Sequence, residues 1–127
     1  MSRWVNYNAN PDHNRTTDCV IRAISTALDE DWDSIFAIIS AYAFDMKNTM
    51  DSNEVWSEFL WDKGFEREAI KHRGRYTVED FCHDHPTGTY LLAIEGHLVC
   101  VKDGFYYDAW DSGQEIPVYY WERKEVD

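Results

Sequence analysis

The chain has 127 residues, enough for one compact domain with a single core and too few for two ordinary domains. Its 24 acidic and 12 basic side chains give a net charge of -12, which argues against nucleic acid or an anionic membrane as the main partner. This charge favours a basic or neutral peptide or protein. No run approaches the roughly 20 apolar residues of a membrane span, and the N-terminus lacks the apolar core of a signal peptide. We therefore expect a cytoplasmic protein with one domain over residues 1–127.

The sequence contains three cysteines, an odd number for a chain without a secretion signal, which predicts free thiols instead of a disulfide framework. Cys82 follows an aromatic residue on a predicted short helix, and Cys100 lies within a predicted strand, so we expect both to pack in the core. The run Cys82-His83-Asp84-His85 lacks the paired CxxC or HExxH spacing of zinc sites. We assign no metal and no cofactor.

Polar and turn-forming residues fill positions 1–15, which we expect to form an extended arm against the domain. From Cys19 onward, apolar side chains follow the spacing of one helical face. Thr16, Thr17 or Asp18 is available as the N-cap of this helix. The pattern predicts a helix that begins near Cys19. Its apolar positions are Val20, Ile21, Ala23, Ile24, Ala27 and Leu28.

Three further helices are predicted in the first two thirds of the chain. The stretches 31–46 and 52–63 each repeat apolar side chains on one face, and Gly64 follows the second in the usual stop position. Thr77, with Asp80 three residues later, is a weaker form of the capping box and predicts a short fourth helix that ends before the next proline.

The last third of the chain has the composition of strands. Residues 90–101 are rich in β-formers, 102–104 is a turn signal, and 105–110 can return as the second strand of a hairpin. Residues 118–121 supply a third strand. Helices followed by strands predict an α+β fold, in which N-terminal helices pack on a C-terminal antiparallel β-sheet.

Cys19 lies where a polar loop meets an apolar helix, and this position suits a nucleophile. The amide groups and partial positive charge of a helix N-terminus stabilise a thiolate, which is the reactive form of cysteine. A nucleophile also needs a base. His97 is a candidate because an unperturbed histidine pKa of about 6.5 allows proton exchange near neutrality. The adjacent Gly96 would let substrate or backbone approach closely.

The register of the predicted hairpin selects a carboxylate to complete the set. If the turn at 103–104 has two residues, His97 shares one face with Asp108 and Trp110. Asp108 is then the diagonal neighbour of His97 and can accept its second proton and fix its tautomer. A three-residue loop or a bulge would shift the register by one and make Asp111 the better placed acid. We favour Asp108. Trp110 would shield the histidine–carboxylate bond from water.

Each of these residues also has a structural interpretation. Cys19 could be a small core residue, and His97 could be a half-exposed strand residue. Asp108 and Asp111 could brace the turn after the hairpin, which is the commoner role of Asp near a strand end. Only the ordered set of thiol, imidazole and carboxylate is informative.

Five runs of residues carry a resemblance to known proteins, namely 14–23, 77–81, 85–90, 96–97 and 107–112. Together they resemble a group of small uncharacterised proteins from bacteriophages and Gram-positive bacteria, over nearly the whole chain. More remotely, the chain is similar to papain-like peptidases that process bacterial leader peptides and use the catalytic order Cys, His, Asp. The resemblance implies a papain-like fold, with Cys19 as nucleophile, His97 as base and Asp108 as orienting acid.

The sequence departs from this family just before the thiol. Papain-like enzymes usually carry a Gln about six residues before the nucleophile, and its amide completes the oxyanion hole. Here His13 occupies that position and Asn14 follows it. Either side chain could donate a hydrogen bond to the developing oxyanion. Losing one such donor typically costs roughly a hundredfold to a thousandfold in rate.

Three functions remain open from the sequence. The first is a thiol hydrolase that acts on a peptide, isopeptide or other amide bond through a thioester. The second is a catalytically weak or silent papain-like domain that binds a host or phage protein, for example as an inhibitor of bacterial defence. The third is an acyltransferase, which differs only in the nucleophile that resolves the thioester.

Overall fold

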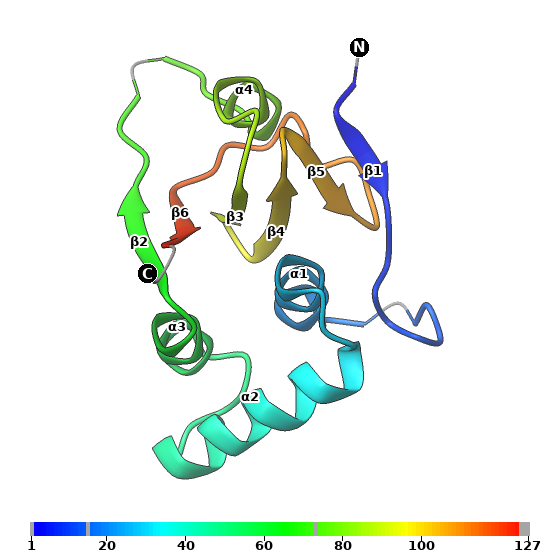
Figure 1. Cartoon of the computed structure of the whole chain (residues 1–127), viewed down its shortest axis with the longest axis vertical. Helices are drawn as coiled ribbons and strands as arrows, with labels where there is room; N and C mark the ends of the chain where they lie inside the picture. The colour runs from blue at the N-terminus through cyan, green and yellow to red at the C-terminus, as the bar shows by residue number, and fades with distance from the viewer. Residues whose placement is uncertain (1, 15, 73, 125–127) are drawn as a thin grey trace.

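A computed structural model describes residues 2–14, 16–72 and 74–124, so Arg15, within the run before Cys19, lies outside the described residues. The described part is a mixed α+β fold with four helices and one six-stranded sheet (Figure 1). The helices are α1 (Cys19–Leu28), α2 (Trp32–Met46), α3 (Asn53–Asp62) and α4 (Val78–Asp84). The strands are β1 (Trp4–Asn6), β2 (Phe65–Ala69), β3 (Thr89–Ile94), β4 (His97–Lys102), β5 (Phe105–Asp108) and β6 (Tyr119–Arg123).

The sheet has the order β1-β5-β4-β3-β6-β2. Its pairs are antiparallel except for β1, which runs parallel to β5. The sheet is therefore mixed, and two of its strands come from before the C-terminal third. The predicted antiparallel C-terminal sheet was wrong in these two respects, because both edge strands are recruited by long-range pairing instead of by their own apolar pattern.

Helices cover the two faces of the sheet unequally. Leu98 and Cys100 of β4 belong to one apolar cluster with α1, α2 and α3, whereas Val99 and Val101 belong to a second cluster with α4. This alternation follows from the two-residue period of a strand. Figure 1 shows α4 on the opposite side of the sheet from the other three helices. Cys19 belongs to the layer formed by α1, α2 and α3, and it lies where this layer meets the sheet.

The four predicted helices are confirmed with small shifts at their ends. Asp31 caps α2 by accepting a hydrogen bond from the Ser34 backbone N–H. Thr77 and Asp80 form both hydrogen bonds of the predicted capping box at α4. Gly64 follows α3 with a φ of 86°, a left-handed conformation that glycine adopts without strain.

The predicted strand 90–101 was wrong in one respect, because Glu95 and Gly96 interrupt it. Gly96 has a φ of 70° and forms the turn between β3 and β4, so that Ile94 pairs with His97. Gly96 is thus a turn residue and not a position inside a strand. The prediction also ended the next strand at residue 110, whereas β5 ends at Asp108.

The predicted two-residue turn between the next two strands is confirmed. Asp103 and Gly104 both have positive φ, at 48° and 82°, as a tight two-residue hairpin turn of this kind requires. Lys102 pairs with Phe105, and Cys100 pairs with Tyr107. The first three residues of β4, 97–99, therefore do not pair with β5. The edge of β4 that faces β5 is open at these residues, and α1 lies against it.

The N-terminal arm lies along the domain, as predicted, and three of its residues form β1. Trp4 pairs with Tyr106, and Asn6 pairs with Asp108. The arm also donates two hydrogen bonds to the Asp108 carbonyl, from Trp4 Nε1 and from the Tyr7 backbone N–H, each at 3.0 Å. It therefore holds the end of β5 in place.

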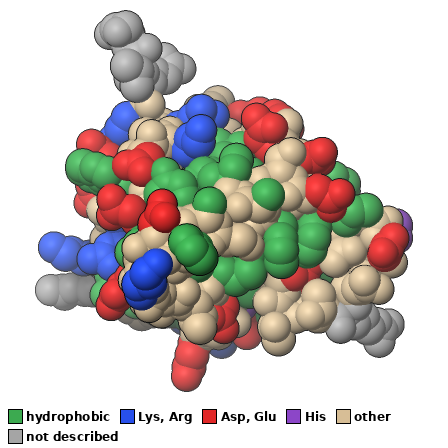
Figure 2. Space-filling model, turned by 90° about the horizontal axis from the view of Figure 1, so that it is seen from below, with side chains coloured by type: hydrophobic (Ala, Val, Ile, Leu, Met, Phe, Trp, Pro, Cys, Tyr) green, Lys and Arg blue, Asp and Glu red, His purple; other side chains and the backbone are tan. Residues whose placement is uncertain are grey.

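Figure 2 views the molecule from the side on which α2 lies in Figure 1, and it shows apolar side chains gathered across that face. Acidic and basic side chains surround them. None of the helices in the described part of the chain is both long and apolar enough to cross a membrane. The exposed large apolar residues of α2 and α3 are Phe36, Ile38, Phe44, Met46 and Trp61.

Candidate active site

Cys19 is the first residue of α1, so its thiol lies at the helix N-terminus as predicted. The helix packs on β3 and β4, which brings this end to the open edge of β4. There the backbone of Leu98 and the side chain of His97 both lie beside the thiol and lower its pKa. The helix start and the strand start thus meet at one sulfur atom.

His97 is the first residue of β4, and its imidazole contacts Asp108 as well as Cys19. Nε2 of His97 lies 2.6 Å from Oδ2 of Asp108. Since Nε2 is engaged by the carboxylate, Nδ1 is the ring nitrogen left to face Cys19. The imidazole lies between a thiol and a carboxylate, with a different nitrogen for each.

Asp108 is buried and held by several donors besides His97. Its Oδ2 also accepts a hydrogen bond of 2.7 Å from Ser112 Oγ, and its Oδ1 accepts one of 2.9 Å from the Ala109 backbone N–H. The Arg22 guanidinium lies 3.8 Å from Oδ1. These contacts fix the rotamer of the carboxylate and supply the partners that a buried charge requires.

The pKa of the Cys19 thiol lies below its ordinary value of 9.0. Burial alone would raise it, but hydrogen bonds with His97 and the Leu98 backbone and the positive charges of His97 and Arg22 outweigh burial. Each of these groups stabilises the thiolate more than the thiol. The surroundings therefore favour the nucleophilic form.

The pKa of His97 is raised to about 9. Burial alone would lower it, but hydrogen bonds with Asp108 and Cys19 and their negative charges raise it further than burial lowers it. The two shifts have opposite directions and share one cause, the contact between thiol and imidazole. Around neutral pH the arrangement favours a thiolate beside an imidazolium.

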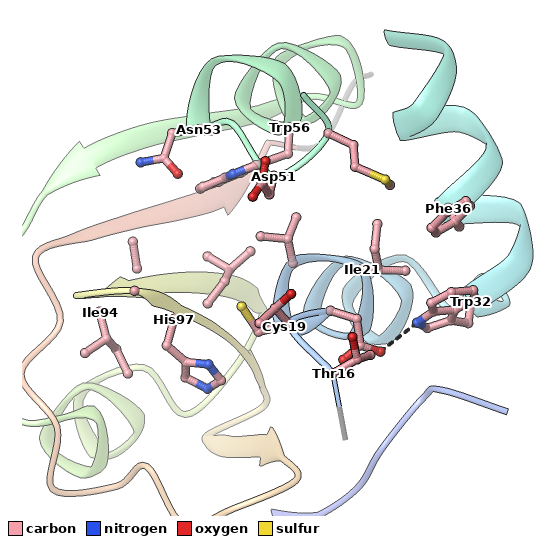
Figure 3. Close-up of a pocket in the computed structure, with 17 residues that line it drawn as sticks. Thr16, Cys19, Ile21, Trp32, Phe36, Asp51, Asn53, Trp56, Ile94 and His97 are labelled. Carbon is pink, nitrogen blue, oxygen red and sulfur yellow. Dashed lines mark hydrogen bonds between the residues drawn. The ribbon is translucent and has the colours of Figure 1, made fainter. Parts of the chain in front are cut away.

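The thiol and the imidazole line a cavity of about 610 Å³ between α1, α2, α3 and the β3–β4 turn (Figure 3). Most of its wall is apolar, and it is open to solvent on one side. A cavity of this size can hold a large side chain or an acyl group. A reactive thiol at the wall of an apolar cavity is suited to attack a carbonyl that an apolar group has brought into place.

The other predicted residues lie at varying distances from this centre. Asp111 accepts hydrogen bonds from Tyr106 Oη and from the Gly113 backbone N–H, so it braces the loop after β5 and is not the partner of His97. His13 and Asn14 are both exposed, and neither lines the cavity. The hairpin register, which the two-residue turn fixes, explains why the carboxylate at position 108 is the one beside the imidazole.

Trp110 lies beside His97, with the two ring centroids 5.0 Å apart and the rings tilted by 41°. This agrees with the placement predicted from the register. Trp110 is also 44% exposed, so it covers the imidazole from the solvent side.

Sequence reasoning named Asp18 only as a possible N-cap and did not single out Arg22, yet both support the site. Asp18 occupies the N-cap position of α1, but its side chain makes no capping hydrogen bond. Asp18 is buried and accepts hydrogen bonds from Asn10 Nδ2, Trp32 Nε1 and Arg22 Nε, at 3.0, 3.0 and 2.8 Å. Figure 3 shows the bond from Trp32 as a dashed line. Asp18 thus ties the arm and α2 to the helix start that carries Cys19. The spacing of four residues between Asp18 and Arg22 was a usable signal, because such pairs face each other on a helix.

All three cysteines are free, and Cys82 and Cys100 are completely buried, as predicted. Burial raises the pKa of each to about 12, so neither is reactive at ordinary pH. Across the described residues, no group of three or more His, Cys, Asp and Glu side chains is arranged to hold a metal ion.

Comparison of the chain with family models, with curated proteins and with solved structures finds no match. The chemistry of the site must therefore be argued from its own geometry. A thiol with a lowered pKa, an imidazole held in one orientation and a buried carboxylate can together perform nucleophilic attack and return a proton to a leaving group.

Proposed function

We propose that this chain is a papain-like thiol hydrolase that cleaves a peptide, isopeptide or other amide bond through a thioester intermediate. The observation that carries the proposal is the position of His97, with one nitrogen 2.6 Å from Asp108 and the other facing Cys19. The α+β fold and the thiol at the start of a helix packed on the sheet support the papain-like assignment.

In the first half of the reaction, the Cys19 thiolate attacks the carbonyl carbon and forms a C–S bond. The protonated His97 gives its proton to the amine nitrogen as the C–N bond breaks. Asp108 holds the imidazole in orientation and stabilises its charged form. The products of this half are a free amine and a thioester.

In the second half, a water molecule attacks the thioester carbonyl and gives a proton to the neutral His97. The C–S bond then breaks, the carboxylic acid leaves, and the thiolate is restored beside the imidazolium. An acyltransferase would follow the same steps with an amine or alcohol in place of water, and this alternative stays open.

The oxyanion needs donors near the thiol. The Cys19 backbone N–H belongs to the first turn of α1, where amide groups have no acceptor within the helix, so it is the first donor. His13 and Asn14 remain the proposed second donors. Because both side chains are exposed and outside the cavity wall, one of them would have to turn toward the carbonyl when substrate binds.

That same position of His13 and Asn14 favours a second candidate, a papain-like domain that binds a protein partner with little turnover. A missing oxyanion donor slows acyl transfer by roughly a hundredfold to a thousandfold, while it leaves binding intact. The net charge of -12 favours a basic or neutral partner for either candidate.

The rate of Cys19 alkylation by iodoacetamide as a function of pH tests the first candidate. We expect reaction well below pH 8, and we expect His97→Ala to move the profile toward that of an ordinary thiol. Cys82 and Cys100 are completely buried, so Cys19→Ala supplies the background rate. If wild type and His97→Ala give the same profile with an ordinary thiol pKa, the hydrolase proposal fails and the binding domain is favoured.

A further inference from the structure

Trp56 of α3 carries the feature that the proposed mechanism leaves unexplained. Its side chain is 3% exposed and lines the same cavity as Cys19 and His97. Its Nε1 is the one buried side-chain nitrogen or oxygen atom without a hydrogen-bond partner in the described part of the chain. Figure 3 shows the indole projecting from α3 into the space between that helix and the α1 and β3–β4 elements.

A buried donor without an acceptor is uncommon in folded proteins, because it has lost its hydrogen bond to water and gained none in return. The half-buried indole of Trp32, which lines the same cavity, has a partner, since its Nε1 donates to Asp18. The contrast makes Trp56 Nε1 a candidate donor for a group that enters the cavity. The occupant would then need a hydrogen-bond acceptor within reach of α3.

The remaining wall defines the other requirement on the occupant. Ile21, Trp32, Phe36, Met50 and Ile94 line the cavity, and together they present aliphatic and aromatic surface from α1, α2, β3 and the loop before α3. Such a wall favours a bulky apolar group through loss of water-exposed surface. Phe36 is 41% exposed at the cavity edge, so the apolar surface continues to the opening through which a substrate would enter.

We propose that the acyl part of the substrate carries a bulky apolar side chain and a second carbonyl oxygen besides that of the scissile bond. Trp56 Nε1 donates a hydrogen bond to this second oxygen. The inference rests on the proposed function, because it places the acyl group of the Cys19 thioester in this cavity. It specifies the substrate class as an N-acylated apolar amino acid or a peptide with an apolar residue at the scissile carbonyl. The donor selects against acyl groups that are apolar but lack the second oxygen.

Chloromethyl ketones test the inference on the protein as it stands. The Cys19 thiolate displaces chloride and forms a C–S bond, so alkylation requires no turnover. N-acetylphenylalanyl chloromethyl ketone has both the ring and the acceptor, whereas 1-chloro-4-phenylbutan-2-one lacks the acetamide. We expect the acceptor-bearing ketone to react about tenfold faster with wild type, as one hydrogen bond predicts. N-acetylglycyl chloromethyl ketone, which lacks the ring, should also react more slowly.

Trp56→Phe removes the N–H and keeps an aromatic ring, so we expect it to abolish the difference between the two phenyl ketones. Trp61→Phe is the matched control, because Trp61 lies on the same helix and is 64% exposed. It should retain the wild-type ratio. Each result is a ratio within one protein and is therefore independent of thiol reactivity.

Two results would overturn the inference: equal rates for the phenyl ketones in wild type, or a preference that survives Trp56→Phe. The wild-type ratio decides even if the Trp56 variant does not fold. Iodoacetamide separates this failure from that of the proposed function. If Cys19 reacts with iodoacetamide at low pH but shows no preference among the ketones, the proposed function stands and the role of Trp56 is refuted. A thiol with an ordinary profile refutes the function itself.

Discussion

Ser112 Oγ donates a 2.7 Å hydrogen bond to Oδ2 of Asp108, the same oxygen that lies 2.6 Å from His97 Nε2. Ser112 is completely buried. The hydroxyl therefore keeps this oxygen directed at the imidazole. It supports the site from the loop after β5, outside the reacting atoms.

We expect Ser112→Ala to lower the free energy of unfolding by about 1 to 3 kcal/mol, because a hydrogen bond to a buried charge is lost. Urea unfolding would measure the change. Thr87→Ala, at an exposed position, should alter stability by less than about 0.5 kcal/mol. Equal stabilities for wild type and Ser112→Ala would show that the hydroxyl does not stabilise the carboxylate.

Asp108→Asn and Asp111→Asn form a matched pair that tests which acid acts on His97. Asp108 raises the pKa of His97, and His97 in turn lowers the pKa of Cys19. Asp108→Asn should therefore raise the thiol pKa. For each pKa unit of this rise, the thiolate fraction at low pH falls about tenfold. Asp111→Asn should leave the iodoacetamide profile unchanged. The reverse pattern would assign the role to Asp111.

Trp110→Ala should reduce both the alkylation rate of Cys19 and the stability. The ring lies 5.0 Å from the imidazole and covers it from water. Since Trp110 is 44% exposed, we expect only about 1 kcal/mol of stability to be lost, together with a several-fold fall in rate at neutral pH. Trp61→Ala provides an exposed tryptophan for comparison. A Trp110→Ala protein with normal reactivity and normal melting temperature would contradict the shielding role.

The raised pKa of His97 predicts how stability depends on pH. In Cys19→Ala the hydrogen bond that His97 donates to Asp108 still raises the histidine pKa, so the folded state binds a proton that the unfolded state releases. The stabilisation is fully present below the unfolded pKa of about 6.5 and is lost as the pH rises through the folded pKa, which is about 9 with the thiol present. Urea unfolding at pH 6 and pH 9.5 would measure it.

A second variant supplies the reference for that measurement. Cys19→Ala with His97→Gln lacks the titrating group, so its stability should fall less between the same two pH values. If both proteins lose the same stability, another group accounts for the pH dependence and His97 is not protonated in the folded state.

The helices and the hairpin turn could be predicted from the sequence, because their signals are local. Apolar spacing after Cys19 predicts α1, and positive φ at Asp103 and Gly104 is what their residue types allow. The register that follows brings His97 and Asp108 together. This part of the site depends on one turn and two short strands.

The parts that could not be predicted depend on contacts with distant residues. In β2 only Phe65 is buried, so the strand has no alternating pattern and exists through its pairing with β6. The single strand predicted over 90–101 hid a turn, because Glu95 and Gly96 are flanked by β-formers on both sides. The orphan N–H of Trp56 has no sequence signal at all, since only the packed structure shows which indoles find a partner.

Because the thiol and the imidazole meet at the open edge of β4, the order in which the chain is synthesised determines when Cys19 becomes reactive. During synthesis, α1 and its thiol emerge long before His97, and the carboxylate and hydroxyl that hold the histidine emerge later still. Until the last third of the chain has folded against α1, nothing from the sheet lowers the pKa of Cys19. A partly synthesised chain would therefore expose an ordinary thiol, and its reactivity would arise only once both the strand and the helix are in place.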